Sequence, residues 1–344
     1  MEVRKLHTLY FVISILVFLL LWLINLGIGS VSIPIEEIAG RFLGKAFSKS
    51  SWEIILMEYR FPKSLTAMLA GTALAVSGLQ MQTFFRNPLA GPYVLGISSG
   101  AGLGVALLSM AGSAFGWVFW KGNFGGWPIT LAASIGAISV LLLMSVTAWR
   151  VKDSMTLLIL GLMFGSAASA MVAVLAYFSE ADELKLYTIW SLGSLGGTGW
   201  EQLNVLAISV VAGLLPVIIW IKSYNAMLLG ENYAKSMGIN LFRLRWAMII
   251  STGILAGSVT AFCGPIAFIG VAVPHIGKML FRTSNHKVLF PGSALIGAIV
   301  LLLCDSVSQL PGSAQTLPIN AVTTLIGAPL VIWLILSRNL SKEF

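Results

Sequence analysis

The pentapeptide G-I-S-S-G at residues 96–100 matches the G-x-S-x-G pattern that carries the nucleophilic serine of many hydrolases. In those enzymes the serine follows a strand and has a histidine base beside it. Here prolines precede the motif, an apolar helical run follows it, and the candidate partners His275 and Asp305 lie far along the chain. An intramembrane serine hydrolase that uses Ser98 is therefore only a remote alternative.

Asp305 is a second candidate because it lies near the end of a long apolar run. An acidic side chain in such a place is costly and often functional, which allows a secondary transporter that uses Asp305 as its proton site. One acid makes a poor proton relay, so a polar contact at a helix end is favoured. His275, directly after Pro274, is interpreted as an interior hydrogen-bonding residue rather than as a metal ligand.

Sequence motifs that bind nucleotides or metals are missing from the chain. The nearest approach to a phosphate-binding loop, G-R-F-L-G-K-A at residues 40–46, has the wrong glycine spacing and lacks the Ser or Thr that holds Mg²⁺. The 2 cysteines and 3 scattered histidines form neither a ligand-spaced cluster nor a disulfide framework. We expect no enzymatic activity, no metal site and no cofactor bound by this chain.

The elements that would position any site are strongly apolar. Hydrophobic types make up 57% of the 344 residues and charged types 10%, against roughly 25% charged residues in soluble domains. Runs long enough to cross a hydrocarbon layer of about 30 Å predict an all-α polytopic membrane protein with a single transmembrane domain over residues 1–344. Ten spans are predicted: His7–Gly29, Ser64–Phe85, Tyr93–Gly112, Trp127–Trp149, Met155–Phe178, Gln202–Ile221, Trp246–Cys263, Ile266–Phe281, Phe290–Gln309 and Pro318–Ser337.

Two of these spans have unusual features. The eighth is short and contains Pro274, so it is the span expected to be tilted, broken or miscounted. The first follows Arg4 and Lys5 and resembles a signal peptide, but no small-x-small cleavage site follows it. We expect an uncleaved first helix.

Charge sets the predicted orientation. An even number of spans puts both termini on one side, and 14 of the 21 Lys and Arg residues fall on that side, which is therefore cytoplasmic by the positive-inside rule. These cations are spread one to three per loop, without a basic run or a basic and aromatic patch, which excludes nucleic acid as a partner.

Small residues and a sharp turn indicate how the helices meet. Arg86, Asn87 and Pro88 begin a polar stretch with two prolines, which predicts a tight cytoplasmic turn between the second and third spans. Small residues recur every four positions on both of those spans, and such strips let helices pack closely. The strips are Ala67, Gly71 and Ala75 on the second span and Gly96, Gly100 and Gly104 on the third.

Two polar segments between spans predict short helices. On the external side, S-I-P-I-E-E-I at residues 32–38 has a candidate N-cap at Ser32 and acids in its first turn. On the cytoplasmic side, residues 224–243 predict an amphipathic helix with an i,i+4 pair of Glu231 and Lys235 and with Gly238 as its C-terminal glycine. The face that carries Leu229, Tyr233, Ser236 and Met237 suits a lipid interface or a protein partner.

A channel, a secondary transporter and the membrane half of a pump all remain open as functions of this chain. The predicted cytoplasmic helix favours the last of these.

Several sequence blocks also closely resemble the FecCD-type permeases of binding-protein-dependent ABC importers for iron-siderophores, haem and vitamin B12. The blocks follow one another along nearly the whole chain: R-F-P-K from Arg60, S-G-L-Q-M-Q from Ser77, R-N-P-L-A-G-P from Arg86, L-G-I-S-S-G-A from Leu95, G-P-I-A-F-I-G-V-A-V-P-H-I from Gly264 and L-P-I-N-A-V-T-T-L-I-G-A-P from Leu317. The resemblance implies a type II ABC importer permease that works in the inner membrane as a homodimer with a central path. It also implies two ATPase subunits, which bind ATP and Mg²⁺, a substrate-binding protein and membrane lipid as partners.

The resemblance assigns roles to particular residues. The cytoplasmic segment resembles the helices that couple the permease to the ATPases, with the coupling residues Gly230, Glu231, Ala234, Lys235 and Gly238. Arg60 resembles an external arginine that pairs with the binding protein. Lys63 stands where Arg is common, and Gln309 replaces a second family arginine, so the docking contact is expected to be weaker or rearranged.

The fifth span and the loop before it resemble the family's path for the cargo. Ser154, Met155 and Thr156 correspond to a cytoplasmic gate, in which Met155 is bulkier than expected. Along the span, the small residues Gly161, Gly165, Ser166 and Ser169 suit either the path or helix packing. The resemblance implies a metal chelate as cargo, meaning ferric siderophore, haem or cobalamin. A sequence without Cys or His clusters is consistent with a metal that arrives already enclosed by its ligand.

Overall fold

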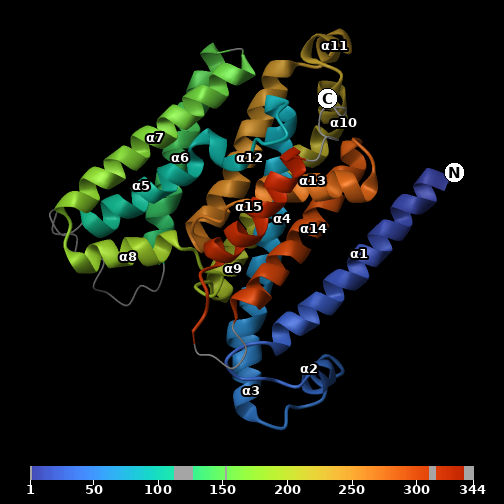
Figure 1. Ribbon diagram of the computed structural model, residues 1–344, viewed down its shortest axis with the longest axis vertical. Helices are drawn as coiled ribbons and strands as arrows, with labels where there is room; N and C mark the ends of the chain where they lie inside the picture. Colours follow the sequence, from blue (N-terminus) through green and yellow to red (C-terminus); the bar gives the residue numbers. More distant parts are fainter. Residues whose placement is uncertain (1, 112–126, 152, 310–314, 337–344) are drawn as a thin grey trace.

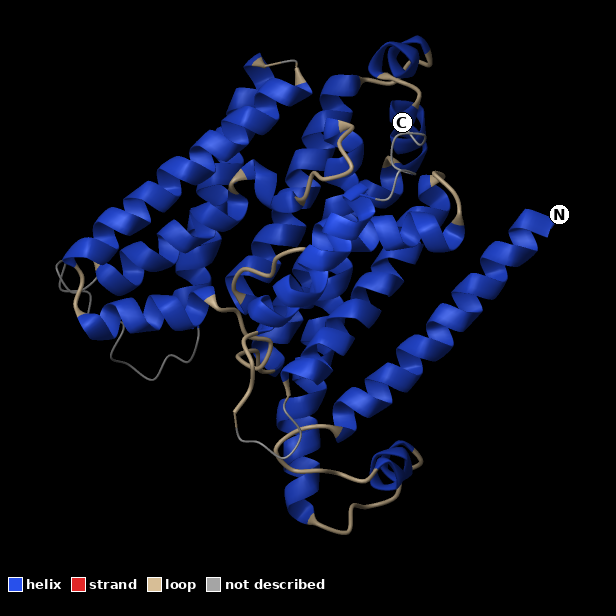
Figure 2. Ribbon diagram, in the orientation of Figure 1, coloured by secondary structure: helices blue, strands red, loops and turns tan. Residues whose placement is uncertain are grey.

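The computed structural model describes residues 2–111, 127–151, 153–309 and 315–336, which are helices, turns and loops without a strand (Figure 2). The helices in chain order are α1 (Glu2–Gly27), α2 (Ile35–Phe42), α3 (Ser50–Ile54), the π-helical turn η1 (Ile55–Arg60), α4 (Phe61–Phe85), the 3₁₀ turn η2 (Pro92–Leu95), α5 (Ile97–Met110), α6 (Trp127–Arg150), α7 (Ser154–Phe178), α8 (Ala181–Ser191), α9 (Trp200–Ile219), α10 (Ile221–Leu228), α11 (Glu231–Ser236), α12 (Leu241–Cys263), α13 (Ile269–Phe281), α14 (His286–Ser308) and α15 (Ile319–Leu336).

The predicted spans all appear as apolar helices. Among the described residues, 7 helices are long and apolar enough to cross a membrane, and α5, α13 and α15 are shorter apolar helices. The predicted all-α membrane fold is therefore confirmed. The eighth span is short, as expected, but it begins later than predicted, because α13 starts at Ile269 after an irregular stretch that includes Phe268 at a φ of 67°. It is a short helix that continues through Pro274.

Helix α4 is the centre of the bundle and contacts α9, α12, α13 and α14 (Figure 1). Small side chains allow these contacts. A Cβ placed on Gly71 would lie 2.2 Å from the carbonyl oxygen of Gly297, and one placed on Gly78 would lie 1.7 Å from that of Gly270. The backbones of α4, α13 and α14 therefore touch, which confirms the close packing predicted for the second span.

The helices α5 to α8 form a second group beside this bundle (Figure 1). Gly104 of α5 faces α6, where a Cβ on it would lie 2.0 Å from the carbonyl oxygen of Ala132. Gly96, just before α5, lies against Gly161 of α7. The predicted strip of small residues therefore packs against two helices, and α12 connects this group to the central bundle through its contacts with α6 and α9.

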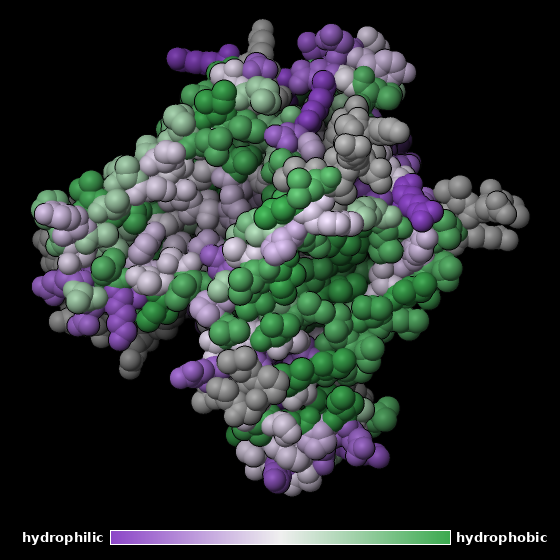
Figure 3. Space-filling model, in the orientation of Figure 1, coloured by the Kyte–Doolittle hydropathy of each residue, from purple (hydrophilic) through white to green (hydrophobic). Residues whose placement is uncertain are grey.

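The polar segments gather at opposite ends of the molecule. Helices α2 and α3 lie at one end, and α10 and α11 lie at the other (Figure 1). Hydrophobic side chains dominate the centre of the face shown in Figure 3, whereas strongly hydrophilic ones lie around its edges, at the top, at the bottom and on the left. This distribution is the one that a bilayer imposes on a spanning protein.

The short helix predicted after the first span exists as α2, but its start differs from the prediction. The N-cap residue is Pro34, which makes no side-chain capping hydrogen bond, so Ser32 does not cap the helix. Glu37 instead accepts hydrogen bonds from the backbone nitrogen and hydroxyl of Ser48. The α2 helix is therefore held by the loop that follows it.

Candidate functional site

The predicted coupling segment consists of two short helices rather than one. Helix α10 ends at Leu228, and α11 starts after Gly230, which has a φ of 110° and a ψ of 151°. Residues that carry a side chain rarely adopt this backbone conformation, so the glycine allows the chain to turn between the two helices. Gly238 follows α11 with a φ of 80°. The nitrogens of Gly238 and Ile239 bond to the carbonyl oxygens of Lys235 and Ala234, which confirms the predicted C-terminal glycine as part of a Schellman motif.

The predicted pair of Glu231 and Lys235 is wrong. Glu231 Oε1 lies 2.7 Å from Arg245 Nη2 in α12, and Lys235 is exposed. Because Arg245 belongs to α12, this ion pair connects α11 to a long spanning helix. Ala234, on the inner side of α11, is fully buried. Helix α11 is therefore a short element fixed at its base to α12.

On α11 and directly beside it lie apolar side chains that the rest of the described chain leaves uncovered. Leu229 is 65% exposed, Tyr233 53% and Met237 60%. We name these three residues the α11 patch. Its exposure at a polar end of the molecule is typical of a surface that binds another protein.

A polar crevice of about 720 Å³ lies at the base of α11. It brings together three sites that are far apart in the sequence: the coupling segment, the loop before α7 and the turn after α4. The residues that line it are Phe84, Phe85, Arg86, Asp153, Met155, Leu229, Gly230, Glu231, Asn232, Tyr233 and Arg245. The structure therefore places three of the predicted sites around one cavity.

The loop that contains the predicted gate is organised by Asp153, which caps α7. Asp153 Oδ2 accepts hydrogen bonds from the hydroxyl of Thr156 at 2.7 Å and from its backbone nitrogen at 2.8 Å. These hydrogen bonds lower the pKa of the Asp153 carboxyl. Met155 is exposed at the start of α7, and the side chain of Ser154 lies outside the described set. A cytoplasmic gate at these residues stays a prediction.

The predicted path residues of α7 divide into two pairs. Gly161 and Gly165 are buried against the segment that precedes α5, where a Cβ on Gly161 would lie 2.2 Å from the carbonyl oxygen of Val94. Ser166 and Ser169 are exposed. The glycines therefore serve packing, whereas the serines lie on a side of α7 that the described chain leaves open.

The turn between α4 and α5 forms as predicted. Arg86 adopts a left-handed conformation with a φ of 47°, and the Asn87 side chain accepts a hydrogen bond from the Leu89 nitrogen. The carbonyl oxygen of Pro88 lies 3.0 Å from His275 Nε2. This contact confirms that His275 is an interior hydrogen-bonding residue.

Arg60, the predicted docking residue, is buried rather than exposed. Its Nη1 donates to the carbonyl oxygens of Leu26 at 2.8 Å and Gly27 at 3.0 Å, and its Nη2 donates to that of Val31. The last carbonyls of a helix lack partners within the helix, and the guanidinium supplies donors and positive charge at the end of α1. Docking of a binding protein through Arg60 stays a prediction, but the guanidinium already has internal partners.

The other two predicted docking residues meet at Asp305. Lys63 Nζ lies 2.9 Å from Asp305 Oδ1, and Gln309 Nε2 donates to Asp305 Oδ2 at 2.8 Å. Asn25 of α1 donates to the same oxygen at 2.9 Å. Asp305 is therefore the polar contact at a helix end that the sequence favours, and nothing in the described structure supports a proton-coupled transporter.

The serine of the G-I-S-S-G motif lacks the setting of a hydrolase. Ser98 lies in the first turn of α5, after the 3₁₀ turn η2 instead of after a strand. Gly100, Ala101 and Gly102, one turn further on, are buried packing positions of that helix. The hydrolase alternative therefore has no support in the described part of the chain.

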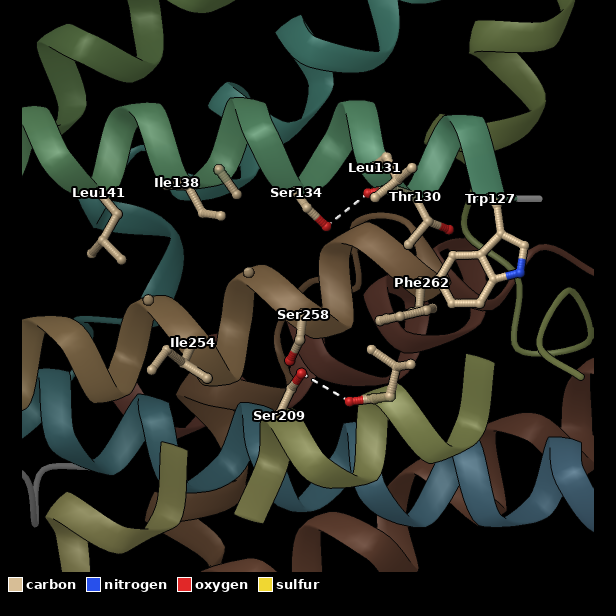
Figure 4. A pocket seen from close by; sticks show the side chains of 14 residues that line it. Trp127, Thr130, Leu131, Ser134, Ile138, Leu141, Ser209, Ile254, Ser258 and Phe262 are labelled. Atoms are coloured by element: carbon tan, nitrogen blue, oxygen red, sulfur yellow. Dashed lines mark hydrogen bonds between the residues drawn. The ribbon is translucent and has the colours of Figure 1, made fainter. Parts of the chain in front are cut away.

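An apolar groove of about 270 Å³ lies between α6, α9 and α12 (Figure 4). Leu131 and Ile138 of α6 and Ile254 and Phe262 of α12 point into it. None of the described residues that line it is charged, and its serine hydroxyls bond to their own helices, as Ser134 does to Thr130. The groove is therefore a hydrocarbon surface and is unsuited to a charged cargo.

Sequence reasoning missed Arg245, Asn25 and Tyr224. Asn25 near the end of an apolar run and Tyr224 within residues 224–243 were visible as isolated polar groups, but their partners lie on distant helices. Nothing in the spacing indicates which partner each of them contacts.

Comparison with known proteins shows the family to which this chain belongs. The sequence profile of the FecCD transport family matches residues 16–337, which is most of the chain. The chain belongs to the FecCD transport family. Within curated relatives, the vitamin B12 import system permease protein BtuC of Salmonella arizonae is 37% identical over 291 residues, covering 83% of this chain and 84% of the relative. The same protein of Salmonella typhi is 38% identical over 288 residues, with the same two coverages.

Solved structures give the same fold. A structure described as an inward-facing metal-chelate type ABC transporter superposes with a TM-score of 0.83 at 28% identity, covering 95% of this chain and 98% of that chain. A complex described as PsaBC from Streptococcus pneumoniae with Fab superposes with a TM-score of 0.54 at 15% identity, covering 88% of this chain and 96% of that chain, and shows the fold alone.

Membership of the FecCD family sets the general role of this chain. It is a membrane-spanning permease component of an ABC importer, in which a separate ATPase drives transport and a binding protein delivers the cargo. The predicted permease class is therefore confirmed.

Proposed function

We propose that this FecCD permease carries a metal chelate, of the class of ferric siderophores, haem and cobalamin, from the outside to the cytoplasm. The curated relatives are named for vitamin B12 import, and a structural relative is described as a metal-chelate type transporter. Both names describe a metal that is already enclosed by an organic ligand. A permease needs no metal-ligating residues of its own for such a cargo.

The α11 patch carries the proposal that an ATPase acts on this chain. Tyr233 is exposed on a short helix that Glu231 and Arg245 fix to α12, and Leu229 and Met237 are exposed just before and just after that helix. An apolar surface on a firmly attached helix can both bind a partner and transmit its movement. The ATPase subunits would bind ATP and Mg²⁺, and this chain would bind neither.

The transport cycle follows from a rigid attachment of this kind. Two copies of the chain form a dimer around the path, and closure of the ATPases on ATP displaces both copies of α11. The bundle then moves between inward-open and outward-open states. In this orientation α10, α11 and both termini are cytoplasmic, and α2 and α3 face the binding protein outside the inner membrane.

The assembly is tested by purifying the permease with its ATPase. Leu229→Asp should remove most of the ATPase that co-purifies, because a charge in the α11 patch cannot be buried in an apolar interface. Leu43→Asp is the matched control, since Leu43 is 80% exposed in the α2 region at the opposite end of the molecule. Equal recovery of ATPase with both variants would exclude the α11 patch as its binding surface.

The cargo is tested in vesicles that contain the permease, its ATPase and its binding protein. Uptake of a ferric siderophore, haem and cobalamin is measured separately, with and without ATP. ATP-dependent uptake of one of these chelates supports the proposal. Uptake of none of them, with ATP hydrolysis intact, would contradict the cargo class.

A further inference from the structure

Helix α10 buries Tyr224, Ala226 and Met227 against the bundle, and Tyr224 also makes a polar contact there. Tyr224 is fully buried, and its ring lies 4.9 Å from that of Phe290 between centroids. Its hydroxyl donates a hydrogen bond to Gln80 Oε1 of α4 at 2.7 Å. The segment next to α11 is therefore bonded directly to the central helix.

Gln80 continues this connection toward two further spans. Its Nε2 donates to Ser251 Oγ of α12 at 3.0 Å, and Ser251 Oγ donates to the carbonyl oxygen of Gly213 in α9 at 2.6 Å. Gln80 and Ser251 are both fully buried. Gln80 accepts one of these hydrogen bonds and donates the next, and so does Ser251. A change at the hydroxyl of Tyr224 therefore disturbs the hydrogen bonds of Gln80 and Ser251 as well.

The neighbouring, half-buried Asn225 makes a second connection. Its Oδ1 accepts from the His286 backbone nitrogen at 2.8 Å and lies 3.0 Å from His286 Nδ1. The other ring nitrogen, His286 Nε2, lies 2.8 Å from Thr83 Oγ1 of α4. Adjacent residues of α10 thus bond to α4 by two routes, one directly and one through α14.

We propose that Tyr224 and Asn225 are the positioning residues through which a displacement of α11 reaches the membrane spans. This inference rests on the proposed function, in which an ATPase displaces α11. Helix α11 itself is anchored by Ala234 and by the pair of Glu231 and Arg245. The wider connection to α4, α9, α12 and α14 is made by α10. A buried polar network of this kind has discrete arrangements, so it moves as a unit instead of deforming.

The test measures cargo taken up per ATP hydrolysed in vesicles that contain the complete transporter. Tyr224→Phe removes the hydroxyl and keeps the ring. We expect the ratio to fall about fivefold, the factor that corresponds to one ordinary hydrogen bond, with the amount of bound ATPase unchanged. Tyr177→Phe, in which the lost hydroxyl is on a residue 84% exposed at the far end of α7, should leave the ratio unchanged.

A second variant keeps the inference testable if Tyr224→Phe fails to assemble. Thr83→Val removes the hydroxyl that faces His286 and should lower the same ratio. A normal ratio in an assembled Tyr224→Phe transporter, or in Thr83→Val when Tyr224→Phe fails to assemble, would overturn the inference and leave the proposed function intact. A wild-type transporter without ATP-dependent uptake would instead remove the proposed function and the inference with it.

Discussion

Lys63 in the first turn of α4 and Asp305 in the last turn of α14 form an ion pair of 2.9 Å, in which Asp305 is 1% exposed and Lys63 18%. Asn25 and Gln309 donate to the second carboxylate oxygen. The carboxylate therefore keeps partners for both oxygens in a place that water hardly reaches. The pair joins the ends of two helices whose backbones also touch at Gly71 and Gly297.

Removing one member of this pair should destabilise the protein. Asp305→Asn leaves the Lys63 ammonium without its counter-ion, and loss of one partner of a buried pair costs roughly 3–5 kcal/mol. Thermal unfolding in detergent measures the loss. The double variant Lys63→Met with Asp305→Leu should recover much of it, because no charge is then left unpaired. Equal stability of Asp305→Asn and the wild type would contradict the structural role.

Substitution of Arg60 should loosen the end of α1. Arg60→Lys keeps the charge but cannot reach the carbonyl oxygens of Leu26, Gly27 and Val31 together, and each lost hydrogen bond costs about 1 kcal/mol. Hydrogen exchange at residues 26–31 should become faster. The control is Arg41→Lys, since Arg41 pairs with Glu53 on the surface.

A charge reversal at Arg60 distinguishes an internal structural role from docking of the binding protein. If Arg60 pairs with the binding protein, Arg60→Glu weakens binding more at low salt than at high salt. If its partners are only internal, the variant lowers the melting temperature without a salt-dependent change in affinity.

A side chain at Gly230 should disturb the junction of α10 and α11. The surrounding space is open, so Gly230→Ala meets no neighbour, but the φ of 110° costs an alanine roughly 1–3 kcal/mol. We expect α11 to shift and the ATPase to bind less tightly, as measured by co-purification. Gly197→Ala is the matched control because Gly197 also lies in open space without a positive φ. Normal ATPase binding by Gly230→Ala would show that the junction tolerates another backbone conformation.

Acid should remove the cap of α7. Hydrogen bonds from Thr156 lower the pKa of Asp153, so the cap stabilises the folded state fully above the ordinary carboxyl pKa of 3.8 and is lost as the pH falls through the lowered value. The melting temperatures of the wild type and Asp153→Ala are compared from about pH 7 down to about pH 3. The difference between them should shrink at the acid end, and a difference that grows there would contradict the assignment.

The sequence by itself determined the features that depend on local composition. Apolar length predicted the spans because an apolar run of sufficient length satisfies its own backbone as a helix in a bilayer. The turn at Arg86 and the glycine at the end of α11 were predictable because proline and glycine restrict or free the backbone where they stand. The small-residue strips likewise predicted which faces pack closely.

Only the tertiary structure decided the polar contacts. Glu231 has a local candidate in Lys235, yet it pairs with Arg245 because the turn after α11 brings the start of α12 beneath it. Arg60, Lys63 and Gln309 read as surface residues, but the ends of α1, α4 and α14 meet and enclose them. A buried polar group takes whichever donor or acceptor the packing brings within about 3 Å, and local sequence spacing does not specify that partner.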